Sequence, residues 1–472
     1  MPALPSRLRC SYCQTGFAFK GSAGFGTLTC RCDRWPVVDG IPVLQRTPLG
    51  VHEHTTGDAE TARTDYRQLV ELIDAGRHEE ALIRCLAFPV EMPGLARLIG
   101  WRLSNSNAFT RLRYALCVPQ VRRLLERRDS LSAVDLFHFF CRPDSPLGEG
   151  PRDYFIHRFG QPRHIAALAL LENLPSSAED RRPVLDVACG AGHFDHYLTQ
   201  RPERSSVIGT DINFFQLWIA KHWIAPAAEF VCADLRDGLP FADDTFSAVF
   251  CSDAYHYVPN RGVLIREMKR CAPGRPAILT RVGNAQIGPN EGRENTLAGY
   301  LQEIEEDVKV FHEHQLVRDY LGRRNPLAST PDTGARECKW LSFAWNVGAR
   351  EPAGWPHAIG KPVLNPIYQR SRSPEGWSLK HAFPSAWFAF ENGAMLTYQP
   401  RRATVEAQQL RLKSNVGALA ERFLIIGVPE RYCPADARER RPWHERLLRN
   451  YRAGRLRDKR FYQRRGWQSF GM

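Results

Sequence analysis

The sequence predicts an α/β fold, built on a doubly wound and mainly parallel sheet, for the middle of the chain. Strand-like and helix-like segments alternate from residue 183 to 282, which is typical of parallel β-α-β units covered by helices on both faces. The first strand, 184–188, ends at a glycine-rich turn, Cys189-Gly190-Ala191-Gly192, that opens into a helix. Backbone N–H groups at such a helix N-terminus can hold a ligand, so we expect a ligand site at this turn.

The strands and helices expected along the chain support this fold. We expect strand 184–188, helix 192–200, strand 206–211, helix 213–223, strand 229–233, strand 246–252, helix 261–270 and strand 276–282. Beyond them we expect a helical pattern over 296–323, a hairpin around Asn392-Gly393 with strands at 387–390 and 395–398, and a buried strand at 423–428. These later segments either complete the far edge of the sheet or form a small subdomain.

Length and composition indicate a multi-domain protein without a membrane span. A chain of 472 residues is long enough for about three domains. No run approaches the roughly 18 apolar residues of a membrane helix, and the first ten residues lack the apolar core of a signal peptide. We therefore expect a cytoplasmic protein whose thirteen cysteines are thiols, apart from those gathered around a metal.

Two cysteine pairs mark the N-terminal segment. Cys10 and Cys13 are two residues apart, and Cys30 and Cys32 are separated by one residue. Two pairs on tight turns can bring four thiolates onto one tetrahedral Zn²⁺, which would stabilise a segment whose own core is thin. We expect a structural zinc site, and the alternative is four free thiols in a small β-segment.

The same segment resembles a known family of small metal-binding modules. Its end, Trp35-Pro-Val-Val-Asp-Gly-Ile-Pro-Val-Leu44, matches the end of the zinc ribbons found at the front of some bacterial methyltransferases, including ribosomal RNA guanine methyltransferases. The C-x-C spacing of the second pair departs from the two-residue spacing usual in such ribbons.

The flanking regions carry weaker signals. Residues 61–150 show helical periodicity, and Gly76–Leu82 looks like one tetratricopeptide-type turn without a second copy, so a helical linker domain is the simpler interpretation. Residues 434–472 hold twelve Arg or Lys against four acids, interleaved with aromatic residues. This basic tail suits phosphate contact and base stacking, although a basic run is more often a solvated helix.

The glycine turn favours a nucleoside without phosphates. The dinucleotide fingerprint G-x-G-x-x-G has a third glycine where this chain has Asp195, and a carboxylate there would repel a diphosphate at the helix N-terminus. No Gly-Lys-Ser/Thr follows the turn, which excludes a P-loop. S-adenosylmethionine is the common nucleoside that remains. Asp211, ending the second strand, can accept both ribose hydroxyls, and Asp234, ending the third, can accept from the adenine amino group.

At these residues the chain resembles the class I S-adenosylmethionine-dependent methyltransferases, particularly the group with small-metabolite and quinone-biosynthesis enzymes. The matching stretches are 184–194, 207–211, 232–235, 239–249 and 272–279. The resemblance implies a Rossmann-like sheet in which Asp186, Gly190 and Gly192 hold the methionine end, Asp211 the ribose, and Asp234 with Leu235 the adenine. Ala188 replaces the first glycine of the usual G-x-G-x-G, which is tolerable if the backbone there stays strand-like.

These observations divide the chain into five parts and leave three functions open. We expect a zinc ribbon (1–47), a helical domain (61–150), a methyltransferase core (151–282), a C-terminal α+β substrate-covering region (283–433) and the basic tail (434–472). The first function is an enzyme that methylates a small metabolite or biosynthetic intermediate at oxygen or nitrogen, with His256 after the fourth strand as general base. The alternatives are an rRNA or tRNA methyltransferase that uses the ribbon and tail, and a non-catalytic cofactor-binding partner protein.

Overall fold

The computed structural model describes residues 4–433 with gaps, and every structural statement below concerns the described residues. The longer gaps are 50–64, 88–106, 142–148, 288–293, 329–337, 393–401 and 406–415. The basic tail lies outside the described residues, so the structure does not address the RNA-binding prediction made for it.

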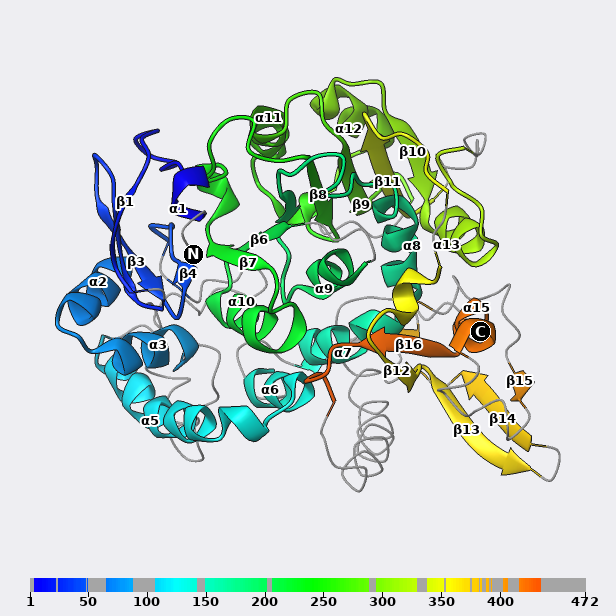
Figure 1. Cartoon of the computed structure of the whole chain (residues 1–472), viewed down its shortest axis with the longest axis horizontal. Helices are drawn as coiled ribbons and strands as arrows, with labels where there is room; N and C mark the ends of the chain where they lie inside the picture. The colour runs from blue at the N-terminus through cyan, green and yellow to red at the C-terminus, as the bar shows by residue number, and fades with distance from the viewer. Residues whose placement is uncertain are drawn as a thin grey trace.

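A seven-stranded sheet with the order β10-β11-β9-β8-β5-β6-β7 forms the centre of the molecule (Figure 1). Its strands are β5 (Val184–Val187), β6 (Val207–Asp211), β7 (Glu229–Cys232), β8 (Ala248–Ser252), β9 (Ala277–Gly283), β10 (Lys309–His312) and β11 (Trp340–Trp345). Strands β5 to β9 pair in parallel. The chain order reverses between β5 and β8, and ligands of such sheets bind beyond the carboxyl ends of the strands at this switch point. The predicted doubly wound, mainly parallel sheet is confirmed.

The far edge of the sheet comes from the region after residue 283. Strand β11 runs antiparallel to both β9 and β10. Part of this region therefore completes the far edge of the sheet, which was one of the two alternatives predicted from the sequence. The continuous helical pattern predicted over 296–323 is wrong: α12 (Leu297–Ile304) is followed by Glu305 in a left-handed conformation, and β10 precedes α13 (Glu313–Leu321). The strand forms because it pairs with β11, a partner about thirty residues away that local periodicity does not reveal.

Some helices cover the sheet, and a second group of helices comes before the sheet in the chain (Figure 1). Those of the core are α8 (Pro162–Leu171), α9 (His193–Gln200), α10 (Phe214–Ile219) and α11 (Arg261–Cys271). The N-terminal ones are α2 (Tyr66–Asp74), α3 (His78–Ala87), α5 (Asn107–Glu126), α6 (Ala133–Phe140) and α7 (Glu149–His157). Among the described residues no helix is both long and apolar enough to cross a bilayer.

The N-terminal ribbon lies against the β7 edge of the sheet (Figure 1). It is a four-stranded antiparallel sheet of β1 (Ala18–Gly21), β2 (Gly26–Thr29), β3 (Arg34–Val38) and β4 (Ile41–Pro42). Just after β4 the chain bridges β7 in parallel, and the N–H of Leu44 donates to the carbonyl of Cys232 at 2.8 Å. An uncovered edge strand presents unpaired backbone groups, and the ribbon covers part of this edge.

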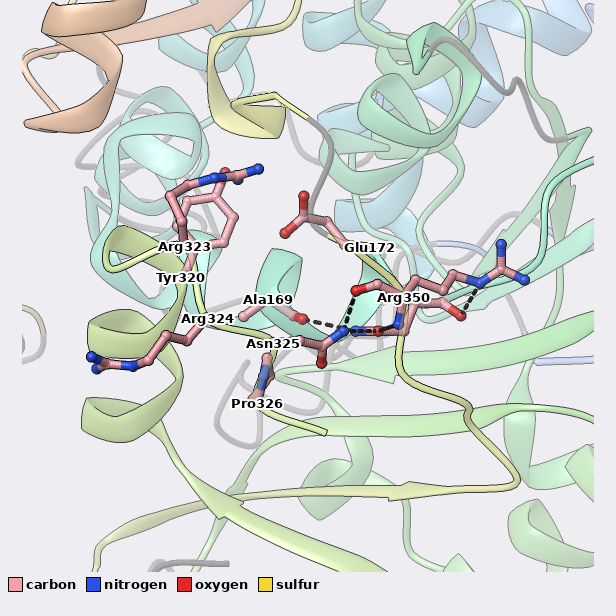
Figure 2. Close-up of a pocket in the computed structure, with 9 residues that line it drawn as sticks. Ala169, Glu172, Tyr320, Arg323, Arg324, Asn325, Pro326 and Arg350 are labelled. Carbon is pink, nitrogen blue, oxygen red and sulfur yellow. Dashed lines mark hydrogen bonds between the residues drawn. The ribbon is translucent and has the colours of Figure 1, made fainter. Parts of the chain in front are cut away.

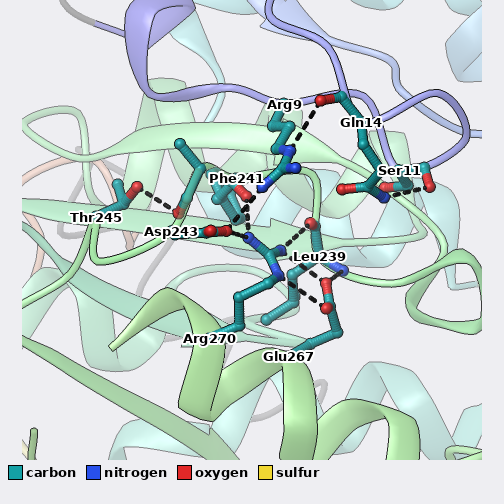
Figure 3. Close-up of polar contacts among 10 residues, drawn as sticks. Arg9, Ser11, Gln14, Leu239, Phe241, Asp243, Thr245, Glu267 and Arg270 are labelled. Carbon is teal, nitrogen blue, oxygen red and sulfur yellow. Dashed lines mark hydrogen bonds and ion pairs between the residues drawn. The ribbon is translucent and has the colours of Figure 1, made fainter. Parts of the chain in front are cut away.

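A polar network joins the ribbon to the core (Figure 3). The carboxylate of Asp243 contacts Arg9 of the ribbon at 2.8 Å and Arg270 of α11 at 2.7 Å. Arg270 also pairs with Glu267 at 2.7 Å, and Glu267 accepts from the N–H of Leu239 at 3.0 Å. Because Asp243 is 63% exposed, these ion pairs orient the ribbon more than they stabilise it.

The C-terminal region adds two small antiparallel sheets. One pairs β12 (Lys361–Leu364) with β16 (Ile425–Val428), which confirms the buried strand expected near 423–428. The other contains β13 (Tyr368–Ser373), β14 (Gly376–His381) and β15 (Arg402–Val405), and α15 (Val416–Glu421) precedes β16.

The hairpin predicted around Asn392-Gly393 is wrong where the structure describes it. Phe388, Ala389 and Asn392 are helical, and the side-chain amide of Asn392 donates to the carbonyl of Phe388 at 3.0 Å. That contact spans one helical turn, and Phe388 is buried against His157 and Phe383. Tertiary packing therefore overrides the turn preference of Asn-Gly. The second predicted strand, 395–398, lies outside the described residues.

Candidate functional site

The glycine turn after β5 has the conformation that its sequence requires. Gly190 has φ +56° and Gly192, at the N-terminus of α9, has φ +74°. A Cβ added to Gly192 would lie 2.9 Å from the Cβ of Ala220, so the turn packs too closely on α10 and its continuation to carry a side chain. Ala188 has φ +57°, in the left-handed region, so the strand-like backbone expected for it is wrong. The turn holds Ala188 in the conformation that the missing glycine would adopt easily.

Asp211 links the second strand to this turn. Its carboxylate accepts a hydrogen bond from the N–H of Gly190 at 3.0 Å and another from the N–H of Asn213 at 2.8 Å. Burial raises the pKa of Asp211. The hydrogen bonds from the backbone N–H groups oppose that rise, and the one from Asn213 has the larger effect. A carboxylate has about four acceptor positions, so two backbone donors leave room for hydroxyl donors.

A pair of buried carboxyl groups lies beneath the turn. Asp186 in β5 is 1% exposed and Asp195 in α9 is fully buried. The two carboxyl groups share a hydrogen bond when one of them is protonated. One oxygen of Asp186 and both oxygens of Asp195 have no other donor in the part of the chain that the structure describes. Burial raises the pKa of Asp195 to about 7, and burial and the nearby Asp195 raise the pKa of Asp186 well above its usual value. Buried acceptors without donors favour a cationic or hydrogen-bond-donating ligand.

This pair makes stability depend on pH. A carboxyl group whose pKa is about 7 when folded and about 4 when unfolded keeps its proton in the folded chain between those values, so the free energy of unfolding falls as pH rises from about 4 to 7. We expect Asp195→Asn to reduce that fall, with the part due to Asp186 remaining, and to be the more stable protein at pH 8, by about 2 kcal/mol. Urea midpoints of the ligand-free chain at pH 5 and pH 8 measure it.

The matched control is Asp129→Asn, since the Asp129 side chain is 94% exposed and its removal should leave the pH dependence as it is. If the stability of Asp195→Asn changed with pH as much as that of the unmodified chain, Asp195 would not be the buried carboxyl group with the raised pKa.

Asp234 is already engaged. Its carboxylate contacts the guanidinium of Arg236 at 2.6 Å and accepts from the hydroxyl of Thr47 in the ribbon segment at 2.5 Å. Asp234 is 3% exposed, and Leu235 beside it is half-buried. Its predicted contact with an adenine stays a prediction. No local pattern in the sequence indicates that Thr47, almost two hundred residues earlier, contacts the end of the third strand.

His256 lies after β8, at the same edge of the sheet as the turn. It is 3% exposed and packs between the rings of Tyr257 and Trp340, at centroid distances of 4.1 and 5.8 Å. Burial opposes the charge of the nearby Asp253, and Arg281, Arg163 and Arg158, with a smaller effect of His256, outweigh it and lower the pKa of Asp253 below its ordinary value. The sequence places His256 at this edge correctly, and its role as a base stays a prediction.

The four ribbon cysteines come together. Their sulfur atoms all lie within 4.8 Å of one another, with Cys10 and Cys32 at 3.7 Å and Cys30 and Cys32 at 3.5 Å. Tetrahedral zinc with Zn–S bonds of about 2.3 Å separates its sulfurs by roughly 3.8 Å. The indole N–H of Trp35 points to the sulfur of Cys30 at 3.4 Å, which is the contact a thiolate ligand accepts. The unusual C-x-C pair therefore fits the same site as the C-x-x-C pair.

Two cavities lie at the opposite edge of the sheet. One is lined by the end of α8 and the segment after α13, including Glu172, Tyr320 and Asn325 (Figure 2). The other is lined by Ser247 and Pro276, which precede β8 and β9. Both therefore open near the amino ends of the strands and contain none of the predicted site residues. Ligands of open α/β sheets bind at the carboxyl ends, so we assign no function to these cavities.

Comparisons with known proteins agree with the geometry of the turn. Residues 184–273 match the sequence model of a methyltransferase domain. A malonyl-[acyl-carrier protein] O-methyltransferase of Legionella pneumophila is 31% identical over 91 residues, covering 19% of this chain and 32% of the relative. A protein of the same name from Halorhodospira halophila is 28% identical over 144 residues, covering 30% and 46%. The chain thus spans less than half the length of these relatives.

Solved structures give a more distant likeness. A TehB-like S-adenosylmethionine-dependent methyltransferase of Corynebacterium glutamicum aligns at 17% identity and a TM-score of 0.29, over 39% of this chain and 88% of that one. The sequence match and the strand order together identify a methyltransferase domain in the centre of this chain.

Proposed function

We propose that this chain is an S-adenosylmethionine-dependent methyltransferase that acts on a small metabolite or biosynthetic intermediate, at oxygen or nitrogen. The observation that carries the proposal is the hydrogen bond from the N–H of Gly190 to Asp211, which joins the glycine turn to an acidic strand end. That pairing favours an unphosphorylated ribose. The names of the two relatives, both O-methyltransferases of an acyl-carrier-bound acid, support a biosynthetic acceptor.

The residues present fit the cofactor. Apart from the hydrogen bond with each other, Asp186 and Asp195 offer buried carboxyl oxygens without donors, which suit the ammonium of a methionine group. Asp211 faces the turn with acceptor capacity to spare, and Leu235 offers an apolar contact next to Asp234. When bound, S-adenosylmethionine supplies an electrophilic methyl group. Transfer is a direct displacement, so these residues act by alignment and by excluding water.

His256 is the proposed general base. An acceptor hydroxyl or amine must lose its proton as it attacks the methyl carbon, and a histidine at the carboxyl end of β8 can take that proton near neutral pH. The ring is held by Tyr257 and Trp340, and Asp253 nearby stabilises its protonated form.

The ribbon is proposed to hold one structural Zn²⁺ through Cys10, Cys13, Cys30 and Cys32. Four protein ligands would close the coordination sphere, which is typical of a structural site and leaves no position for chemistry. Its role here is to hold the ribbon against β7 and Thr47 against Asp234.

Calorimetry on the full chain tests the cofactor assignment. We expect S-adenosylmethionine and S-adenosylhomocysteine each to bind one to one, and NAD to show no heat above dilution, since Asp195 stands where dinucleotide sites need glycine. Tighter binding of NAD than of S-adenosylmethionine would overturn the proposal.

A further inference from the structure

Three buried arginines converge on one carboxylate beyond the end of β8. Asp253 contacts the guanidinium groups of Arg281 at 3.0 Å, Arg158 at 3.4 Å and Arg163 at 3.5 Å. The arginine side chains are only 3–4% exposed. They come from three separate segments, the turn before α8, α8 itself and β9. We call Arg158, Arg163, Arg281 and Asp253 the arginine cluster.

The cluster gathers buried charges of both signs. Among the described ion pairs, Asp253 contacts all three arginines, and Glu313 contacts Arg281 at 2.8 Å. Burial lowers the pKa of Arg163, and repulsion from Arg281 and Arg158 adds to the effect. Like charges gathered in a poorly hydrated place are costly unless an anion balances them.

Aromatic rings fix the arginines in place. The ring of Tyr154 lies 4.7 Å from the guanidinium carbons of both Arg158 and Arg163, and the ring of Trp340 lies 4.0 Å from that of Arg281. Tyr154 and Trp340 are half-buried, and the Asp253 side chain is 10% exposed, so the cluster is close to the surface but almost closed. It therefore presents a rigid set of donors just beneath the surface.

The backbone is strained at this point. Asp253 has φ +59° and Arg281 has φ +54°, both in the left-handed region although neither is glycine. The two strand ends are joined, because the N–H of Asp253 donates to the carbonyl of Thr280 at 2.9 Å. Residues with such a strained backbone conformation occur more often at functional sites than in ordinary loops.

The cluster adjoins the glycine turn. Arg158 lies close enough to Asp186 to oppose the rise in the pKa of that carboxyl, and Arg158 also reaches the hydroxyl of Ser252 at the end of β8 at 3.5 Å. His256 follows Asp253 by three residues. The cluster therefore lies at the carboxyl edge of the sheet, between the proposed cofactor site and the proposed base.

We propose that the arginine cluster binds an anionic group, a carboxylate or a phosphate monoester, on the methyl acceptor. Planar guanidinium groups match both anions through paired hydrogen bonds. Asp253 holds the three arginines apart and oriented, and an incoming anion would share them from the side of its 10% exposed carboxylate. The inference rests on the proposed function, since it assigns the acceptor of the same site.

Binding of small anions to the full chain, saturated with S-adenosylhomocysteine, tests it. The probes are malonate, inorganic phosphate and the neutral malonamide, measured by calorimetry. We expect malonate or phosphate to bind saturably and malonamide not to bind. Arg163→Met should weaken that binding about tenfold or more, and Arg182→Met, a control whose partners Asp180 and Asp244 lie at the other edge of the sheet, should not.

Asp253→Asn keeps the proposal testable if the arginine variants misfold. Asparagine tolerates the left-handed conformation and is isosteric with aspartate, so the local backbone should keep its path. The arginines lose their shared carboxylate, so we expect a lower stability together with a stronger attraction for an added anion. We expect the anion to bind severalfold more tightly. Malonate alone would indicate a carboxylate acceptor, and phosphate alone a phosphorylated one.

Absence of binding for both anions, an unchanged affinity in Asp253→Asn, or equal losses in Arg163→Met and Arg182→Met would overturn the inference. Binding of S-adenosylhomocysteine is measured first. Its absence would count against the proposed function itself, whereas cofactor binding without anion binding would refute only the arginine-cluster assignment.

Discussion

Asp211→Asn is expected to weaken S-adenosylmethionine binding about 100-fold or more, while the chain stays folded. The carboxylate accepts from two backbone N–H groups and, in the proposed complex, from two ribose hydroxyls. An amide has one oxygen and presents two donors, so it cannot serve all of these donors at once. Each hydrogen bond to a charged group contributes about 1.5–3 kcal/mol, and loss of two gives at least the stated factor.

Titration calorimetry measures the effect, with circular dichroism to confirm the fold. Asp180→Asn is the matched control, because Asp180 is a partly buried aspartate in ion pairs with Arg182 and Arg275 at the opposite edge of the sheet. An Asp211→Asn chain that binds with unchanged affinity would remove Asp211 from the cofactor site.

Removal of zinc is expected to unfold the ribbon and to lower cofactor affinity together. The ribbon residues Leu28, Trp35 and Val37 are buried in one apolar cluster with Val231 and Phe241 of the core, so loss of the metal exposes both sides of that interface. Thr47 would leave Asp234, and the β7 edge would lose its pairing with the segment after β4.

Elemental analysis should find one zinc per chain, and treatment with a strong chelator or Cys13→Ser should lower the unfolding midpoint by several degrees. Cys338→Ser, a half-buried cysteine outside the ribbon, is the control. A chain that contains no zinc, or whose unfolding does not respond to chelation, would leave the four cysteines as free thiols.

The parts of this molecule that local sequence determines were predictable. Periodicity, turn chemistry and ligand spacing predict the strand and helix order from residue 184 to 282, the glycine turn at Gly190 and Gly192, and the convergence of the four ribbon cysteines. Asp211 could be placed at the turn because parallel strands end at one edge of the sheet.

The rest depends on contacts between distant segments. The arginine cluster draws Arg158, Arg163 and Arg281 from three segments, none with a motif of its own. Thr47 reaches Asp234 only because the ribbon docks on β7. The helix expected across residues 309–312 becomes a strand because β11 provides a partner, and the left-handed Ala188 follows from the closure of the turn around it. Tertiary packing determines these features, and the hydrophobic periodicity of the sequence carries no information about it.

Transfer of label from S-adenosyl-L-[methyl-³H]methionine tests the central claim most directly. The zinc-loaded full chain is incubated with separated small-molecule and RNA fractions of an extract from its source cells. We expect label to enter the small-molecule fraction, in compounds retained by an anion exchanger, and the rate to fall strongly in His256→Gln without a matching loss of cofactor affinity. Label that enters RNA instead, or no transfer to either fraction by a chain that binds the cofactor, would contradict the account.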